Sequence, residues 1–141
     1  MRDMRLLLVL AAALAVVASA SAATTPSKPV HASMSTTSTK PLVDTPWRYT
    51  IVVQDRAGKP LAAKARLQIL LGNLVVGCWK GSAIEQCSGA RSGTWIAFKG
   101  KRTGVITWPA QSAGVKLTFQ ATVVAAGRAL KLRAPVTVKL P

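Results

Sequence analysis

The chain has 141 residues, enough for one domain, and half of them are hydrophobic, which excludes a wholly disordered protein. Nineteen Lys and Arg residues stand against four acids, so the net charge is +15 and anionic surfaces and polymers will attract the chain. Two cysteines and one histidine leave little material for metal binding or acid–base catalysis.

An export signal is predicted over residues 1–22. Two arginines among the first five residues precede a purely apolar run over residues 6–17, and an Ala-Ser-Ala sequence ending at Ala22 fits the rule for cleavage sites. The run is shorter than the roughly 20 residues that span a bilayer comfortably. An uncleaved N-terminal anchor is the alternative, and both interpretations place the domain outside the cytoplasm.

Cleavage would remove two cations and one acid, so the mature chain would carry a charge of +14. No second apolar segment follows the export signal. We therefore expect a secreted, extracellular protein without a transmembrane span in its mature chain.

Residues 23–46 are predicted to be a disordered linker. They are rich in Ser, Thr and Pro, and such a composition cannot bury enough apolar surface to order itself. The only histidine, His31, falls in this segment, where a lone histidine is expected to be inert rather than a metal ligand. A spacer is the preferred interpretation over a glycosylated segment.

Residues 47–141 are predicted to form one β-sandwich domain. Apolar and polar residues alternate with a period of two, which indicates half-buried strands separated by turns. Seven strands are expected, over residues 49–54, 63–71, 74–80, 94–99, 105–108, 115–123 and 130–140. Turn residues bound them, as in the Asp55–Pro60 segment and at Gly72-Asn73. Short antiparallel strands of this spacing predict an all-β fold of two packed sheets.

The last two strands carry the clearest alternation in the chain. One phase is apolar and is predicted to face the core: Val115, Leu117, Phe119, Ala121, Val123, Leu130, Leu132, Ala134, Val136, Val138 and Leu140. The other phase is polar or basic and is predicted to face the solvent.

The stretch V-Q-D-R-A-G-K-P-L, from Val53 to Leu61, resembles the opening of bacterial immunoglobulin-like surface domains. The end of the chain, Gly114 to Leu140, is similar to the last hairpin of those modules, so the resemblance covers about 95 residues. Two departures are the Ala62-Ala63 pair, where Gly or Asn is common, and cysteines that do not bridge the second and sixth strands. The resemblance implies an immunoglobulin-like sandwich used for spacing or adhesion, with no catalytic residue.

Cys78 and Cys87 are the only cysteines of a chain predicted to be exported, so a disulfide between them is expected. It would close a loop of ten residues, worth about 2.7 kcal/mol in the chain-entropy model. Two cysteines alone cannot complete a zinc site. No metal or other cofactor is predicted.

The four tryptophans have two interpretations. Buried indoles would be core residues, whereas an exposed row would be a platform on which sugars stack, with Trp79, Trp95 and Trp108 as the candidates. Both phases of the middle strands carry apolar residues, so the pattern leaves the choice open.

The basic residues fall largely on outward strand positions. Lys116, Lys131, Arg133 and Lys139 are the candidate polyanion-binding residues, because the last hairpin puts them on one face. A basic helix or an aromatic–basic nucleic-acid motif is not found in the sequence, so sequence-specific nucleic-acid binding is not expected. Motifs of catalytic nucleophiles, metal hydrolases and phosphate loops are not found either, and no enzyme activity is predicted.

The sequence therefore predicts a secreted, non-catalytic immunoglobulin-like module with a structural or adhesive role at or outside the cell surface. The alternative is an extracellular protein that binds carbohydrates or acidic polymers. Its partners would be acidic polymers or glycans of the cell surface, or another surface protein.

Overall fold

The computed structural model describes residues 29–141, so the predicted export signal and the first residues of the predicted linker lie outside the described residues. The described chain forms nine strands and one short 3₁₀ turn, η1 (Ala110–Ser112). The strands are β1 (Val30–Thr36), β2 (Trp47–Asp55), β3 (Ala62–Leu71), β4 (Leu74–Trp79), β5 (Ile84–Gln86), β6 (Trp95–Lys99), β7 (Lys101–Ile106), β8 (Lys116–Ala125) and β9 (Arg128–Thr137).

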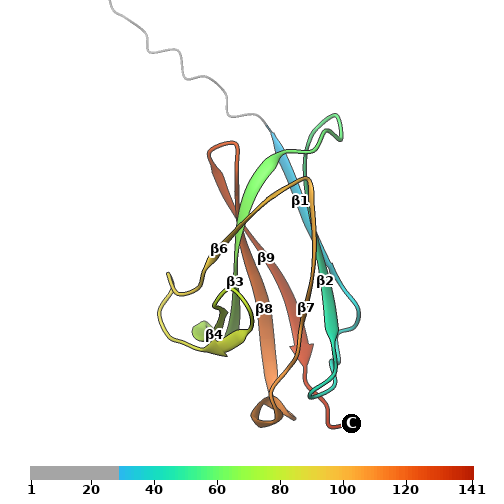
Figure 1. Cartoon of the computed structure of the whole chain (residues 1–141), viewed down its shortest axis with the longest axis vertical. Helices are drawn as coiled ribbons and strands as arrows, with labels where there is room; N and C mark the ends of the chain where they lie inside the picture. Colours follow the sequence, from blue (N-terminus) through green and yellow to red (C-terminus); the bar gives the residue numbers. More distant parts are fainter. Residues whose placement is uncertain (1–28) are drawn as a thin grey trace, which may run out of the picture.

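These strands form two antiparallel sheets that pack face to face (Figure 1). The smaller sheet has the order β1-β2-β7. The larger has the order β5-β4-β3-β8-β9, and β6 pairs with the first half of β3 on the edge that β4 occupies further along. The predicted all-β sandwich of antiparallel strands is confirmed.

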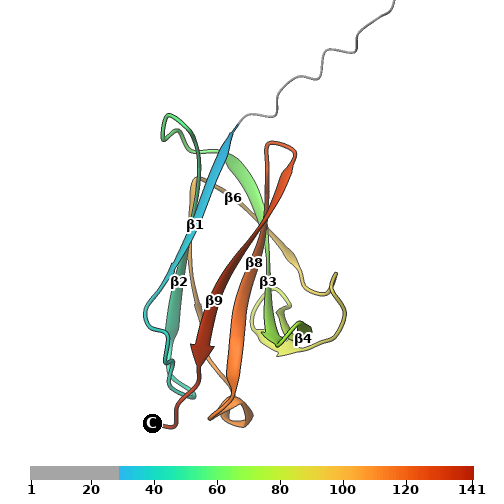
Figure 2. The same cartoon turned by 180° about the vertical axis from the view of Figure 1, so that it is seen from behind.

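The predicted disordered linker is wrong for residues 30–36, because they form a strand. β1 pairs with β2 over its whole length, from Val30 opposite Asp55 to Thr36 opposite Tyr49. Figure 2 shows that it also lies beside β9, so it closes the sandwich between the two sheets. The domain therefore begins near Val30 rather than at Trp47.

Two further segments differ from the predicted strands. The expected turn over residues 100–104 is reduced to Gly100, and the residues after it belong to β7. Arg102, expected in that turn, donates from Nε to the hydroxyl of Tyr49 at 3.4 Å. The expected loop over residues 81–92 contains the short strand β5, which pairs with β4.

The core is formed by the inward phases of both sheets. Tyr49, Ile51 and Val53 of β2 are fully buried, and they face Phe119 and Val123 of β8, which are buried as well. The Phe119 ring lies 5.2 Å from Trp47 and 5.1 Å from Tyr49, measured between ring centroids. The predicted inward phase of β8 is confirmed.

The inward phase of β9 is buried unevenly along the strand. Val136 and Val138 are buried, but Leu130, Leu132 and Ala134 are only half-buried. The prediction that Leu140 faces the core is wrong, because this residue lies three positions beyond Thr137, the last residue of β9, and is 71% exposed.

One glycine allows the close approach of an aromatic core residue. Gly104 of β7 lies directly opposite Tyr49 of β2, and a Cβ atom there would overlap the Tyr49 ring. Because overpacking of this kind strains a close-packed interior, a glycine is required at position 104 for the ring to occupy this place.

Candidate functional site

The outward face of β3 is covered by the loop that follows β5. A disulfide between Cys78 of β4 and Cys87 anchors this loop, as predicted. Arg66 of β3 donates from its guanidinium to the carbonyl oxygens of Ala90 and Arg91, at 3.2 Å each. The loop therefore stays against the sheet through one covalent bond and several hydrogen bonds.

A row of hydrogen-bonded side chains crosses the outward face of three strands. Gln68 donates to the carbonyl oxygens of Ala90 at 3.0 Å and Ser92 at 2.8 Å. Its own side-chain oxygen accepts from Gln120 at 3.3 Å, and the Gln120 oxygen accepts from Nε of Arg133 at 2.9 Å. Because Gln68 and Gln120 are buried, these bonds satisfy groups that would otherwise be costly.

The tryptophans do not form the candidate sugar-binding row. Trp108 is 1% exposed, and its ring packs edge-on against the buried Trp47, 5.4 Å away between centroids. Trp79 is half-buried and packs against the core. The core interpretation therefore holds for Trp47 and Trp108, and the proposed row of Trp79, Trp95 and Trp108 is wrong as a continuous platform.

Trp95 is the one large exposed aromatic side chain among the described residues, at 37% exposure. Two cations lie over its ring: Nζ of Lys64 at 4.7 Å from the centroid and the guanidinium carbon of Arg66 at 4.6 Å. Such contacts are worth about 0.5–1 kcal/mol each at exposed positions, so the ring is already paired within the protein.

The four candidate polyanion-binding residues lie on one outward face of the β8–β9 hairpin. Lys131 is opposite Thr122, Arg133 is opposite Gln120, and Lys116 is opposite Thr137. Residues directly opposite in adjacent strands point to the same side of the sheet. Lys139 is exposed just beyond the buried Val138 and continues the same phase.

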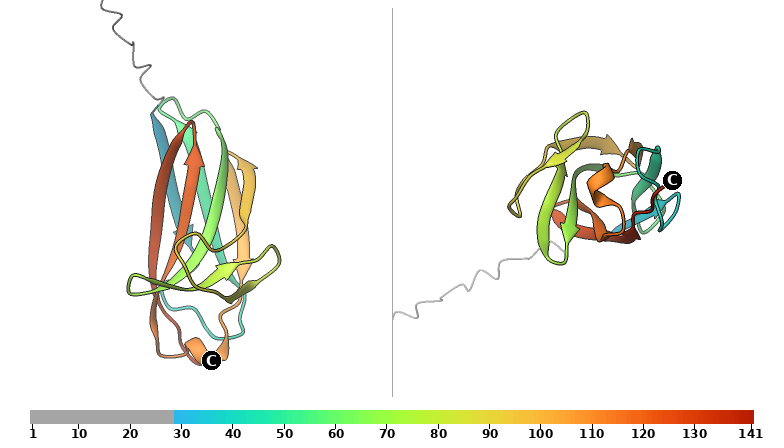
Figure 3. Two further views of the ribbon diagram at one scale, coloured as in Figure 1. Left: turned by 90° about the vertical axis from the view of Figure 1, so that its left-hand side faces the viewer. Right: turned by 90° about the horizontal axis from the view of Figure 1, so that it is seen from below.

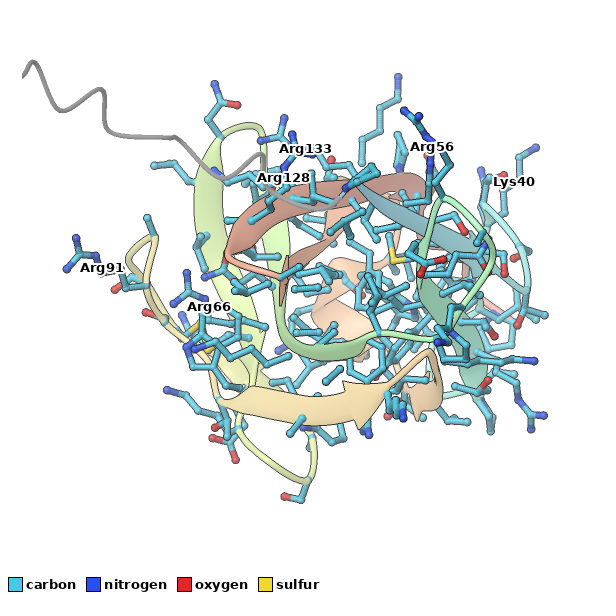
Figure 4. The ribbon with its side chains drawn as sticks, turned by 90° about the horizontal axis from the view of Figure 1, so that it is seen from above. Lys40, Arg56, Arg66, Arg91, Arg128 and Arg133 are labelled. Carbon is cyan, nitrogen blue, oxygen red and sulfur yellow. A yellow bond between two sulfur atoms is a disulfide. The ribbon has the colours of Figure 1, made fainter. Side chains whose placement is uncertain are left out.

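The structure adds two cations to the four candidate polyanion-binding residues. Lys64 of β3 is exposed and shares this face, because Arg66, two residues further, is opposite Thr122. Lys40 comes from the predicted linker and lines a shallow hollow of about 270 Å³ together with Lys116, Thr118 and Pro135. We call the set Lys40, Lys64, Lys116, Lys131, Arg133 and Lys139 the cation strip. Arg133 points away from the sandwich in Figure 4.

The acidic residues lie elsewhere. The described acids are Asp44 before β2, Asp55 at the end of β2 and Glu85 in β5. The Asp55 carboxylate accepts hydrogen bonds from the backbone N–H groups of Ala57 at 2.9 Å and Lys59 at 2.8 Å, which hold the β2–β3 turn. The strands β3, β8 and β9, which carry four of the six residues of the cation strip, hold none of the three carboxylates.

Within residues 29–141, no group of three or more His, Cys, Asp or Glu side chains is placed to hold a metal ion. Over the same residues, none of the secondary structure is a helix long and apolar enough to cross a membrane. His31 lies exposed on β1.

Comparison with protein-family models finds no match, and comparison with curated proteins finds no significant one. The class of the protein is therefore defined by its architecture alone: an all-β, two-sheet antiparallel sandwich with one disulfide and a cation-bearing face.

Proposed function

We propose that the protein is a secreted, non-catalytic, immunoglobulin-like module that binds acidic polymers at or outside the cell surface. Binding would be by charge, through the cation strip. The observation that carries this proposal is the register of β3, β8 and β9, which puts basic residues from distant parts of the chain on one face of three strands that contain no acidic residue.

The dimensions of the strip suit a linear polymer. Lys131 and Lys139 are eight residues apart along one extended segment, roughly 27 Å at the rise of a β-strand. A polyanion lying along this segment would meet a cation at several positions, and each contact would release counterions. The hollow between Lys40 and Lys116 offers a place where one sulfate, phosphate or carboxylate group could be contacted by two ammonium groups.

A structural or adhesive role toward another surface protein is compatible with the same fold, as the resemblance to bacterial immunoglobulin-like domains implies. A glycan ligand is favoured by one observation, the exposed ring of Trp95. Lys64 and Arg66 lie over that ring. An anionic sugar could therefore stack on the ring and pair with the two cations, whereas a neutral sugar would have to displace them.

The test compares two variants with the same change in net charge. The strip variant carries Lys116→Gln, Lys131→Gln, Arg133→Gln and Lys139→Gln. The control variant carries Arg48→Gln, Arg56→Gln, Lys59→Gln and Lys101→Gln, at positions on β2, β7 and the β2–β3 turn. Binding to heparin and to a short DNA duplex is measured as a function of salt concentration, with protein recovered from the medium, whose N-terminus is expected at or near Ala23.

The strip variant should elute from heparin at clearly lower salt than the control. On DNA the slope of log K against log salt should fall by about 2–3 units in the strip variant and by less than about 1 in the control, because each lost phosphate contact lowers the slope by about 0.9. Exchanging the DNA sequence should change neither value. Equal behaviour of the two variants would mean that the positive charge acts as a bulk property and that the strip is not a site.

A further inference from the structure

The turn between β3 and β4 carries a pair of exposed leucines. Leu71 and Leu74 are directly opposite each other across the two residues of the turn, and they are 48% and 71% exposed. Because directly opposite residues in adjacent strands point to the same side, the two side chains form one apolar knob, which we call the leucine turn. Leucines scattered singly over a surface are ordinary, but these two adjoin each other and most of Leu74 is open to solvent.

The leucine turn projects from the sandwich on the side that carries the cation strip. The left panel of Figure 3 shows the turn extending past β9, and in Figure 4 it protrudes to the side to which Arg133 points. Leu70 is opposite Thr118 of β8, so the turn that follows Leu70 lies at the end of the sheet where β8 begins with Lys116. A flat surface that contacts the strip at this end would therefore meet the leucine turn as well.

Three lysines of the cation strip gather at this end of the sheet. Lys116 is the first residue of β8, and it lines the shallow hollow of about 270 Å³ together with Lys40. Lys139 follows the end of β9, and its backbone N–H donates to the carbonyl oxygen of Pro41 at 2.8 Å. The segment that contains Lys40 is thereby held against the end of β9, so the three lysines come from neighbouring chain segments.

A third exposed leucine lies on the other side of these lysines. Leu42 is 42% exposed and forms a parallel bridge with Lys139, so the two side chains share one side. Its segment lies beside β9, whereas the leucine turn lies beyond β8, and Lys116 and Lys139 therefore stand between two apolar groups. Asp44, two residues after Leu42, is the acid of this segment, and the local charge remains positive.

The part of the β3–β4 hairpin around the turn is uncharged. The chain has no charged residue between Arg66 and Lys80. Glu85 of β5 is opposite Cys78, at the end of β4 away from the turn. The leucine turn can therefore enter an apolar layer without taking a charge out of water, which would be costly.

A bilayer of anionic lipids matches the lysines and the leucines at once. It offers negatively charged headgroups to the lysines and, directly beneath them, hydrocarbon to the leucines. An acidic polymer in water, such as a DNA duplex or a polyphosphate, offers the charge but no apolar layer. The combination of complementary charge and exposed leucines therefore favours a lipid surface as the partner of this end of the molecule.

We infer that the protein attaches to the surface of a bilayer that contains anionic lipids, with its three exposed leucines at the boundary of the hydrocarbon and the lysines between them on the lipid phosphates. The inference rests on the cation strip of the proposed function, to which it adds apolar contacts. Both parts are needed for stable attachment, because a single short apolar group binds a membrane marginally and attraction by charge is screened by salt.

The first test measures binding of the whole mature protein to lipid vesicles by cosedimentation. Vesicles of phosphatidylcholine and phosphatidylglycerol in equal parts should bind the protein, and vesicles of phosphatidylcholine alone should bind it about tenfold more weakly or less. The strip variant of the proposed function should lose binding to the mixed vesicles, and its control variant should keep most of it. Equal binding to both kinds of vesicle, or full binding by the strip variant, would contradict the contact between lysines and headgroups.

The second test separates the leucine turn from the charge. Leu74→Ser should weaken binding to the mixed vesicles by about 3–10-fold, because it removes an apolar group from the hydrocarbon and leaves the charge unchanged. Val105→Ser is the matched control, since Val105 is 44% exposed but lies on β7 of the smaller sheet, and it should bind as the wild type does. Neither variant should change elution from heparin. Equal vesicle binding by the two variants would mean adsorption by charge alone and would overturn the inference.

The emission of an added tryptophan locates the turn relative to the bilayer. After subtraction of the wild-type spectrum, Leu74→Trp should show a blue-shifted emission on the mixed vesicles and quenching by lipids brominated along their chains, whereas Val105→Trp should show neither. Vesicle-bound Leu74→Trp protein without this quenching would place the turn outside the bilayer and overturn the inference. Wild-type protein that binds heparin but not the mixed vesicles would refute the lipid partner alone, and protein that binds neither would refute the proposed function as well.

Discussion

The β8–β9 hairpin and the strand β1 share the same alternation of inward and outward residues. Only the strands of the hairpin, however, can be predicted from the sequence. In β8 the inward positions include Phe119 and Val123, which are fully buried. In β1 they are Val30, Ala32 and Met34, which are half-buried against the core, and the residues between them are exposed. The two regions differ in the size of the side chains that alternate.

This difference shows where an argument from composition fails. The segment around β1 is rich in Ser and Thr, and such a composition favours disorder for an isolated chain. In the folded protein β1 orders because β2 offers it a complete row of backbone partners and β9 covers its other side. Its strand structure therefore depends on tertiary pairing rather than on its own hydrophobic content.

Among the changes that test this comparison, deletion of residues 29–36 is expected to lower the stability of the domain most. It removes the antiparallel partners of β2, each hydrogen bond being worth about 0.5–1.5 kcal/mol net, together with the apolar cover of the core edge. The expected loss of unfolding free energy is at least about 5 kcal/mol, comparable with the whole stability of a small domain. Urea denaturation followed by tryptophan fluorescence measures it.

The control for this deletion changes the exposed residues His31, Ser33 and Ser35 to Thr, which retains the strand. This variant should unfold at the urea concentration of the wild type. A deletion variant with an unchanged midpoint would show that the segment is a dispensable linker.

Phe119→Ala is expected to have the next largest effect, because it removes a fully buried ring that contacts Trp47 and Tyr49. The expected cost is about 3–5 kcal/mol, measured in the same denaturation experiment. Thr118→Ala, on the outward phase of the same strand, should cost less than about 0.5 kcal/mol. A cost below about 1 kcal/mol for Phe119→Ala would mean that the strand is shifted by one residue.

Met34→Ala tests how much the half-buried inward side chains of β1 contribute to stability. Met34 lies opposite Ile51 of β2 and is half-buried, so the loss should be about 1–2 kcal/mol, below the range for fully buried methionines. Ser33→Ala, its exposed neighbour, should change stability by less than about 0.5 kcal/mol. If both variants have the wild-type midpoint, β1 adds backbone pairing alone and its inward side chains add nothing.

Most strands could be predicted from the sequence, because their alternation is strong and the turns between them contain Gly, Asp or Pro. The start and end of β7 could not, because Gly104 interrupts its apolar phase. In the structure, a glycine at position 104 leaves room for the ring of Tyr49, a residue more than fifty positions earlier in the chain. A contact at this sequence separation leaves no trace in a local pattern.

The residues of the candidate sites also differ in whether the sequence alone could place them. The basic residues of the hairpin could be placed on one face because the period of a strand and a tight turn decide it. Lys40 could not be included, since its place beside Lys116 follows from the hydrogen bond between the Thr137 N–H and the Thr39 carbonyl oxygen, which holds the segment after β1 against β9. The burial of Trp108 also followed only from the packing of both sheets.

The sequence by itself determined the class of fold, the phase of the longest strands and the pairing of Cys78 with Cys87, because these depend on residue periodicity and on the number of cysteines. Only the tertiary structure decided which tryptophans are core, that residues 30–36 form a strand, and that Lys40 lies beside Lys116. Those features arise where the edges of two sheets meet or stay apart, and the period within one strand carries no information about the edge of another.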